Sequence, residues 1–138
     1  MIAITRTGAV ETRPRRRRNA LLWAAQILLA AAFLVAAVPK LAGAHSAVAM
    51  FSRIGAGQWL RYLVGTAELA GAIGLLIPPL AGLAAAGLAA DMAGATIINV
   101  VVLHSPAVAM TIPLCVAFTL IARGRWEHRR NLAAAISR

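Results

Sequence analysis

Two carboxylic acids stand inside apolar stretches of this sequence, and their chemistry raises the first question about function. Glu68 lies in "YLVGTAELAGAIGLLI" and Asp91 lies in "LAADMAGATI". An ionisable side chain in a membrane-crossing helix is costly to bury, so by default it marks a candidate functional site. Two carboxyls that lie close together at low dielectric cannot both ionise cheaply. We therefore expect one of them to hold a proton near neutral pH.

Three other polar residues are potential partners of these acids. Lys40 ends the first apolar segment and is the expected cationic partner of Glu68, with Arg61 as the alternative. Asn99 follows Asp91 by two helical turns and can donate a hydrogen bond into the protein interior. An alternative for each acid is a purely structural role, and Lys40 can instead extend to the lipid headgroups. The candidate binding residues are Lys40, Glu68, Asp91 and Asn99.

Small residues surround both acids on the predicted helices. At about 100° per residue, the residues that share a face with one or other acid include Gly65, Gly71, Gly87, Gly94 and Ala95. Small residues at this spacing let helix backbones approach closely in membranes, so we predict that both acids face protein. We expect Asp91→Asn to fold normally and Asp91→Leu, which overfills a cleft, to fold poorly.

The other reactive residue types form no recognisable catalytic or metal site. The single cysteine, Cys115, cannot form a disulfide within the chain. His45 and His104 lack the spacing that defines a metal site. No nucleophile–base pair and no phosphate-binding glycine loop is visible. We therefore expect no metal site. We also expect no catalytic activity of the chain's own, but the sequence leaves catalysis open.

The composition is that of an integral membrane protein. Of 138 residues, 61% are hydrophobic, whereas a soluble domain contains roughly half. The formal net charge of +10 comes from arginines at the two ends of the chain. The run "RPRRRR" has no interleaved aromatic residues and directly precedes an apolar segment, which argues against a nucleic-acid partner. Such runs indicate the cytoplasmic side of a membrane and contact anionic lipids.

The apolar segments predict an all-α, four-helix integral membrane bundle. Its spans are expected at about 20–41, 61–77, 80–103 and 107–122, between a basic tail at 1–19 and another at 123–138. The prolines after Ile77 and the "HSP" sequence at 104–106 predict the breaks between the later spans. Four spans place both termini on one side, and the arginine-rich tails make that side cytoplasmic.

Separate predictions concern the N-terminal tail, the stretch 41–60 and the first apolar segment. We expect the N-terminal tail to be disordered, and the stretch 41–60 to be a loop with a short amphipathic piece at the headgroups, formed by Met50, Phe51, Ile54 and Trp59. The first apolar segment can alternatively be a signal peptide cleaved before His45. Its apolar core, however, exceeds the usual length of about 7–15 residues and fits a span better.

The sequence resembles the DoxX-like family of small bacterial membrane proteins. The resemblance rests on "VPKL", on "FSRIGAGQWLRYLVGTAELAGAIGLLIPP" with its "G..E..G..GLL" pattern, and on "DMAGATI". It runs from about residue 28 to residue 125. The positions that match the family's pattern are Lys40, Glu68, Met92, Gly94 and Ala95, and Asp91 is not one of them. The resemblance implies a four-helix membrane bundle, and it implies function poorly. Some relatives are linked to quinone-coupled sulfur oxidation or to oxidative-stress complexes.

Three functions remain open from the sequence. The first is a non-catalytic membrane subunit that supports a redox or quinone-linked partner through its buried acids, in the bacterial inner membrane. The second is a small proton-coupled carrier, which would need a homo-oligomer to line a path. The third is a structural or assembly protein whose acids only specify packing. A quinone is the one cofactor that we consider, and the expected partners are lipids, a redox protein or a second copy of the chain.

Overall fold

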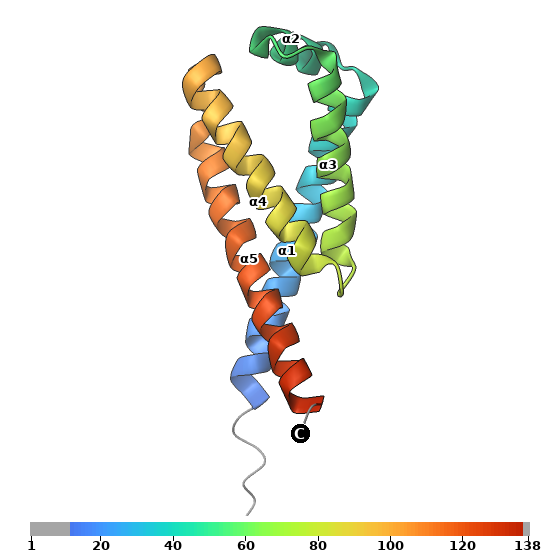
Figure 1. Cartoon of the computed structure of the whole chain (residues 1–138), viewed down its shortest axis with the longest axis vertical. Coiled ribbons are helices and arrows are strands. Elements are labelled where there is room, and N and C mark those ends of the chain that lie inside the picture. Colours follow the sequence, from blue (N-terminus) through green and yellow to red (C-terminus); the bar gives the residue numbers. More distant parts are fainter. Residues whose placement is uncertain (1–11, 137–138) are drawn as a thin grey trace, which may run out of the picture.

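The computed structural model describes the chain from residue 12 to residue 136, with side chains from residue 14 to residue 130. In this part all regular secondary structure is helical (Figure 1). The elements are α1 (Thr12–Ala42), α2 (His45–Ile54), α3 (Gln58–Leu76), α4 (Ala81–Ile98), the π-helix η1 (Asn99–Leu103) and α5 (Val108–Ile136). The predicted all-α class is confirmed.

Three helical stretches are long and apolar enough to cross a membrane. They are Pro14–Ala42, Ala81–Leu103 and Val108–Arg130. Helix α3 is not among them, because Gln58, Arg61 and Glu68 lower its hydropathy. The structure therefore supports a membrane protein with several apolar helices, and it does not confirm the fourth span predicted at 61–77.

The long helices form two pairs. Helix α1 packs along α3, α4 packs along α5, and the contact between α3 and α4 joins the pairs (Figure 1). Helix α2 crosses the end of the molecule away from the start of α1 and the last turns of α5. Both described ends of the chain therefore lie at one end of the molecule, which we call the terminal end.

The breaks between helices follow the local sequence. Ile77 is extended, with φ −100° and ψ 112°, because the ring of the next residue, Pro78, disfavours helix before it. His104 adopts a left-handed conformation with φ 47° and ends η1. Gly55, with φ 78°, ends α2 in the same way, and glycine has no Cβ to oppose this conformation. The breaks predicted after Ile77 and at 104–106 are confirmed.

Two sequence expectations are corrected. Residues 12–19 are helical rather than disordered, because arginine is a good helix former and the apolar helix already supplies the nucleus. The basic tail predicted at 123–138, for which no disorder was predicted, continues α5 as far as Ile136. Phe51, expected at the headgroups, is only 3% exposed, because α2 packs on α3. The part of the N-terminal tail before residue 12 lies outside the described residues.

The core lies where all four long helices meet. Phe33 of α1 and Phe118 of α5 contact edge to face, with ring centroids 5.0 Å apart. The other buried members of this cluster are Ala30, Ala72, Leu75, Ala85, Leu88, Met92, Ile121 and Ala122. Four of these eight residues are alanines, which let the helices lie close together.

Candidate functional site

Lys40 and Glu68 form a closed ion pair between α1 and α3. The Lys40 Nζ atom lies 2.7 Å from Glu68 Oε2 and 3.0 Å from Oε1, and it also donates to the carbonyl oxygen of Ala36 at 3.2 Å. The two side chains are only 16% and 5% exposed. The pair expected from the sequence is therefore present, and each charge has a partner.

Gly65 lets α1 approach α3 at this pair. A Cβ atom at Gly65 would lie 3.0 Å from Leu41 Cδ2 and 3.1 Å from Lys40 Cβ, closer than ordinary van der Waals contact. Gly65 therefore lies at a close approach of α1 and α3. This approach places the lysine stem directly against α3, one turn before Glu68.

Arg61, the alternative partner of Glu68, has a different role. Its guanidinium donates to the carbonyl oxygen of Lys40 and, through Nε, to Gln58 Oε1 at 2.8 Å. It also lies 4.1 Å from the centre of the Tyr62 ring. Arg61 is only 4% exposed, so it binds the C-terminal end of α1, where the helix dipole favours a cation.

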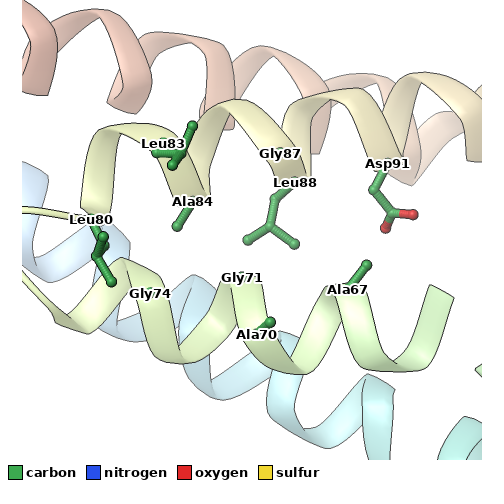
Figure 2. Close-up of a pocket in the computed structure, with 10 residues that line it drawn as sticks. All are labelled: Ala67, Ala70, Gly71, Gly74, Leu80, Leu83, Ala84, Gly87, Leu88 and Asp91. Carbon is green, nitrogen blue, oxygen red and sulfur yellow. The ribbon is translucent and has the colours of Figure 1, made fainter. Parts of the chain in front are cut away.

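Asp91 lies at one end of an apolar groove between α3 and α4. The groove has a volume of about 300 Å³. Figure 2 shows the Asp91 carboxyl extending from α4 toward Ala67 of α3. The other residues that line the groove are Ala70, Gly71, Gly74, Leu80, Leu83, Ala84, Gly87 and Leu88. Asp91 is therefore the single charged residue in an otherwise apolar lining.

One carboxyl oxygen of Asp91 has no hydrogen-bond partner. Its Oδ2 atom is buried, and no described residue donates to it. Buried polar atoms are nearly always hydrogen-bonded, and leaving one without a partner costs about 1–3 kcal/mol. Asp91 also lies within electrostatic range of Glu68 and Lys40, which agrees with the prediction that the two acids are neighbours. The proton predicted on one acid stays a prediction.

The glycines around the groove fall into two classes. A Cβ atom at Gly71 would lie 2.6 Å from Leu88 Cγ, and one at Gly74 would lie 2.8 Å from Ala84 Cβ, so both permit the contact of α3 with α4. A Cβ atom at Gly87 or Gly94 would meet nothing within 4 Å. The close-packing role predicted for Gly87 and Gly94 is therefore wrong within this chain, because α4 turns them toward open space.

Residues 24–121 of the chain match the DoxX-like family. The chain belongs to this family. The matched segment covers most of α1 and all of α3 and α4, so it includes the ion pair and the groove of this DoxX-like protein. Neither a curated protein nor a solved structure shows a match to the chain.

Two other predicted residues of the DoxX-like segment lie beside the site rather than in it. Asn99 is the first residue of η1, and its carbonyl oxygen accepts from the backbone of Ser105 at 3.0 Å. Within residues 14–130 its side chain makes no hydrogen bond to either acid. Ala95 is half-buried and packs against the core.

Sequence reasoning missed a second polar cluster, at the terminal end. Gln26 is fully buried, and its Nε2 donates to the carbonyl oxygen of Leu75 at 2.5 Å. Its Oε1 accepts from Arg125 Nε at 2.6 Å. The sequence placed Arg125 in the basic tail at 123–138 rather than in the interior. No local signal distinguishes Arg125 from Arg123, which directly follows the apolar run and is exposed.

Proposed function

We propose that this DoxX-like protein is a non-catalytic, multi-pass membrane subunit that holds a lipophilic, quinone-like ligand in the groove between α3 and α4. The observation that supports this proposal is the unpartnered Asp91 oxygen at the end of an apolar groove. A quinone has an apolar body that fits such a lining and oxygen atoms that hydrogen-bond to a carboxyl group. Ligand sites typically combine a mostly apolar lining with a few polar groups.

Helix α3 serves as the fourth span in this proposal. Its 19 residues would extend about 28 Å, close to the thickness of the hydrocarbon core. Its acid is neutralised by Lys40, and its arginine is bonded to α1. Because these polar groups are satisfied by α1, the low hydropathy of α3 does not prevent it from lying within the bilayer.

The distribution of charge supports an inner-membrane orientation with both termini in the cytoplasm. At the end opposite the termini, Lys40 and Arg61 are engaged inside the protein, which leaves Arg53 as the exposed arginine of α2 and α3. At the terminal end, α1 exposes the run 15–18 and α5 exposes Arg123, Arg129 and Arg130. Lysine and arginine in excess on one side favour the cytoplasm.

The proposed partner is a redox protein that exchanges the ligand with the groove. The described residues supply no redox-active cysteine pair, so the electrons would be carried by the ligand and the partner. A purely structural role is the alternative. It is favoured by the closed Lys40–Glu68 pair, which joins α1 to α3 without any ligand.

Extraction of the purified protein tests the proposal. The protein is isolated from bacterial membranes in mild detergent, and its quinones are extracted with solvent and quantified by chromatography. Gly87→Leu should fill the groove, whereas Gly94→Leu adds the same side chain at another open position outside the lining. We expect quinone to be extracted from the wild type and from Gly94→Leu. The amount extracted from Gly87→Leu should be lower by about 90%, which corresponds to a tenfold loss of affinity. Equal amounts in all three would refute the proposal.

A further inference from the structure

Arg125 is a buried cation without a counter-ion at the terminal end of the bundle. The residue is only 9% exposed. Nε donates to Gln26 Oε1 at 2.6 Å and Nη1 donates to Asn19 Oδ1 at 2.8 Å. Both acceptors are neutral amides, and the face of the guanidinium lies over the Trp23 ring, 4.8 Å from its centre.

The third nitrogen of Arg125 is unsatisfied. Nη2 is buried and has no hydrogen-bond partner among the described residues. Of the described acids, Glu68 pairs with Lys40 and Glu127 pairs with Arg18, while Asp91 lies in the groove between α3 and α4 and forms no ion pair with Arg125. A buried charge that is neither paired nor fully hydrogen-bonded is strongly unfavourable. The geometry therefore leaves one anion missing at this position.

The position of Arg125 indicates where that anion comes from. Arg125 lies seventeen residues after Val108, the first residue of α5, which corresponds to about 26 Å along the helix. If α5 enters the bilayer near Val108, Arg125 reaches the opposite boundary of a hydrocarbon core about 30 Å thick. Lipid phosphates lie at that boundary, and exposed arginines of α1 and α5 surround it.

Arg125 differs from these surrounding arginines in its orientation. Arg123 and Arg129 on the same helix are exposed, as expected of side chains that reach toward the headgroups. Arg125 instead points inward, against α1. General attraction of basic tails to an anionic membrane does not explain an arginine held between helices by two amides and an indole.

We propose that Arg125 binds a phosphate group at the terminal end of the bundle, supplied by an anionic phospholipid of the facing leaflet. Arginine is suited to this role because its planar guanidinium bonds phosphate oxygens with two nitrogens. The bound phosphate would provide the missing partner of Nη2, and it would tie α1 to α5 through Asn19, Trp23 and Arg125. Free phosphate has the same chemistry and is the second source to test.

The test measures thermal stability in detergent micelles with added lipid. Phosphatidylglycerol is compared with phosphatidylcholine and with inorganic phosphate, for the wild type and three variants. Arg125→Gln removes the proposed ligand group, and Arg123→Gln makes the same charge change at an exposed site. Asn19→Asp places a carboxylate where an amide already accepts from Nη1, so it supplies the counter-ion from within the chain.

We expect phosphatidylglycerol to raise the melting temperature of the wild type and of Arg123→Gln by about 5 °C, as ligand binding to the folded state does. The rise should be lost in Arg125→Gln and at least halved in Asn19→Asp. If Arg125→Gln does not fold, the melting-temperature rise of Asn19→Asp tests the proposal instead. A rise that inorganic phosphate reproduces, and that depends on Arg125, supports the site with free phosphate as its source.

Two results would overturn the proposal. One is an equal rise in the wild type and all three variants, which would assign the effect to the basic tails as a whole. The other is the absence of any rise in the wild type with either phosphate source.

Discussion

At the scale of single residues, the two membrane acids differ in how completely they are satisfied. Glu68 has both oxygens within 3.0 Å of Lys40 Nζ, whereas Asp91 leaves Oδ2 without a partner at the end of a groove. A satisfied buried pair is typical of packing, and an unsatisfied buried group calls for a ligand or another explanation. The two acids are therefore expected to respond differently to substitution.

Breaking the Lys40–Glu68 pair should destabilise the protein. Lys40→Met leaves a buried carboxylate without its cation, at a cost of about 3–5 kcal/mol in the free energy of unfolding. The double variant Lys40→Met with Glu68→Gln removes both charges and should recover at least about 1 kcal/mol of that loss. Denaturant unfolding in detergent measures both, with Arg53→Met, at an exposed arginine of α2, as the control. Strictly additive losses would show that the pair is not coupled.

Replacing Asp91 should have the opposite effect on stability. Because Asp91 Oδ2 has no partner and the groove leaves space beside it, Asp91→Leu should leave the unfolding free energy unchanged or raise it by about 1 kcal/mol. The sequence-based expectation that this variant folds poorly is revised for this reason. The same unfolding assay measures it, and Asp91→Asn should remain within about 0.5 kcal/mol of the wild type. A loss above about 2 kcal/mol in Asp91→Leu would indicate a structural acid.

At the scale of helices, the contact of α3 with α4 depends on glycine at particular positions. Gly71→Ala would place a Cβ atom 2.6 Å from the side chain of Leu88, which is only 1% exposed, so the two helices or the leucine must shift. We expect a loss of about 1–3 kcal/mol in the free energy of unfolding. Gly87→Ala meets nothing within 4 Å and should gain about 0.5–1 kcal/mol from helix propensity. Equal effects of the two substitutions would contradict the observed packing of α3 on α4.

The helices and their breaks were predictable because proline, glycine and long apolar runs act locally. The pairing of Lys40 with Glu68 was also predictable, since few charges occur in the apolar segments and the two lie on successive predicted spans. The roles of Gly87 and Gly94 were not, because a glycine in a helix does not reveal which way the helix face turns. Arg125 was missed for a similar reason, since an arginine next to an apolar run usually reaches toward water.

At the scale of the whole molecule, we predict that α1 is retained as a membrane helix. Cleavage before His45 would remove Lys40, the partner of Glu68, and Gln26, which bonds the end of α3. The core would also lose Phe33. Sequencing the mature N-terminus tests this point, and a chain that starts at His45 would show that the first helix is a leader.

The proposed topology predicts the result of reporter fusions. A reporter fused after Arg138 should be active on the cytoplasmic side, and one inserted near His45 should be active on the outer side. The physical reason is the excess of exposed arginine at the terminal end. Cytoplasmic activity at both sites would mean that α1 does not cross the membrane, and outer activity at Arg138 would reverse the orientation.

A binding titration tests most directly whether the groove between α3 and α4 binds a lipophilic ligand through Asp91. A short-chain quinone is titrated into the protein in lipid nanodiscs while the dissociation constant is measured for the wild type, Asp91→Leu, Gly87→Leu and Gly94→Leu. Loss of a hydrogen bond to a carboxyl group is worth about 1.5–3 kcal/mol, or roughly 10–100-fold in affinity. We predict such a loss in Asp91→Leu and Gly87→Leu, with Gly94→Leu unchanged. One affinity shared by all four proteins, or no binding to the wild type, would contradict the account.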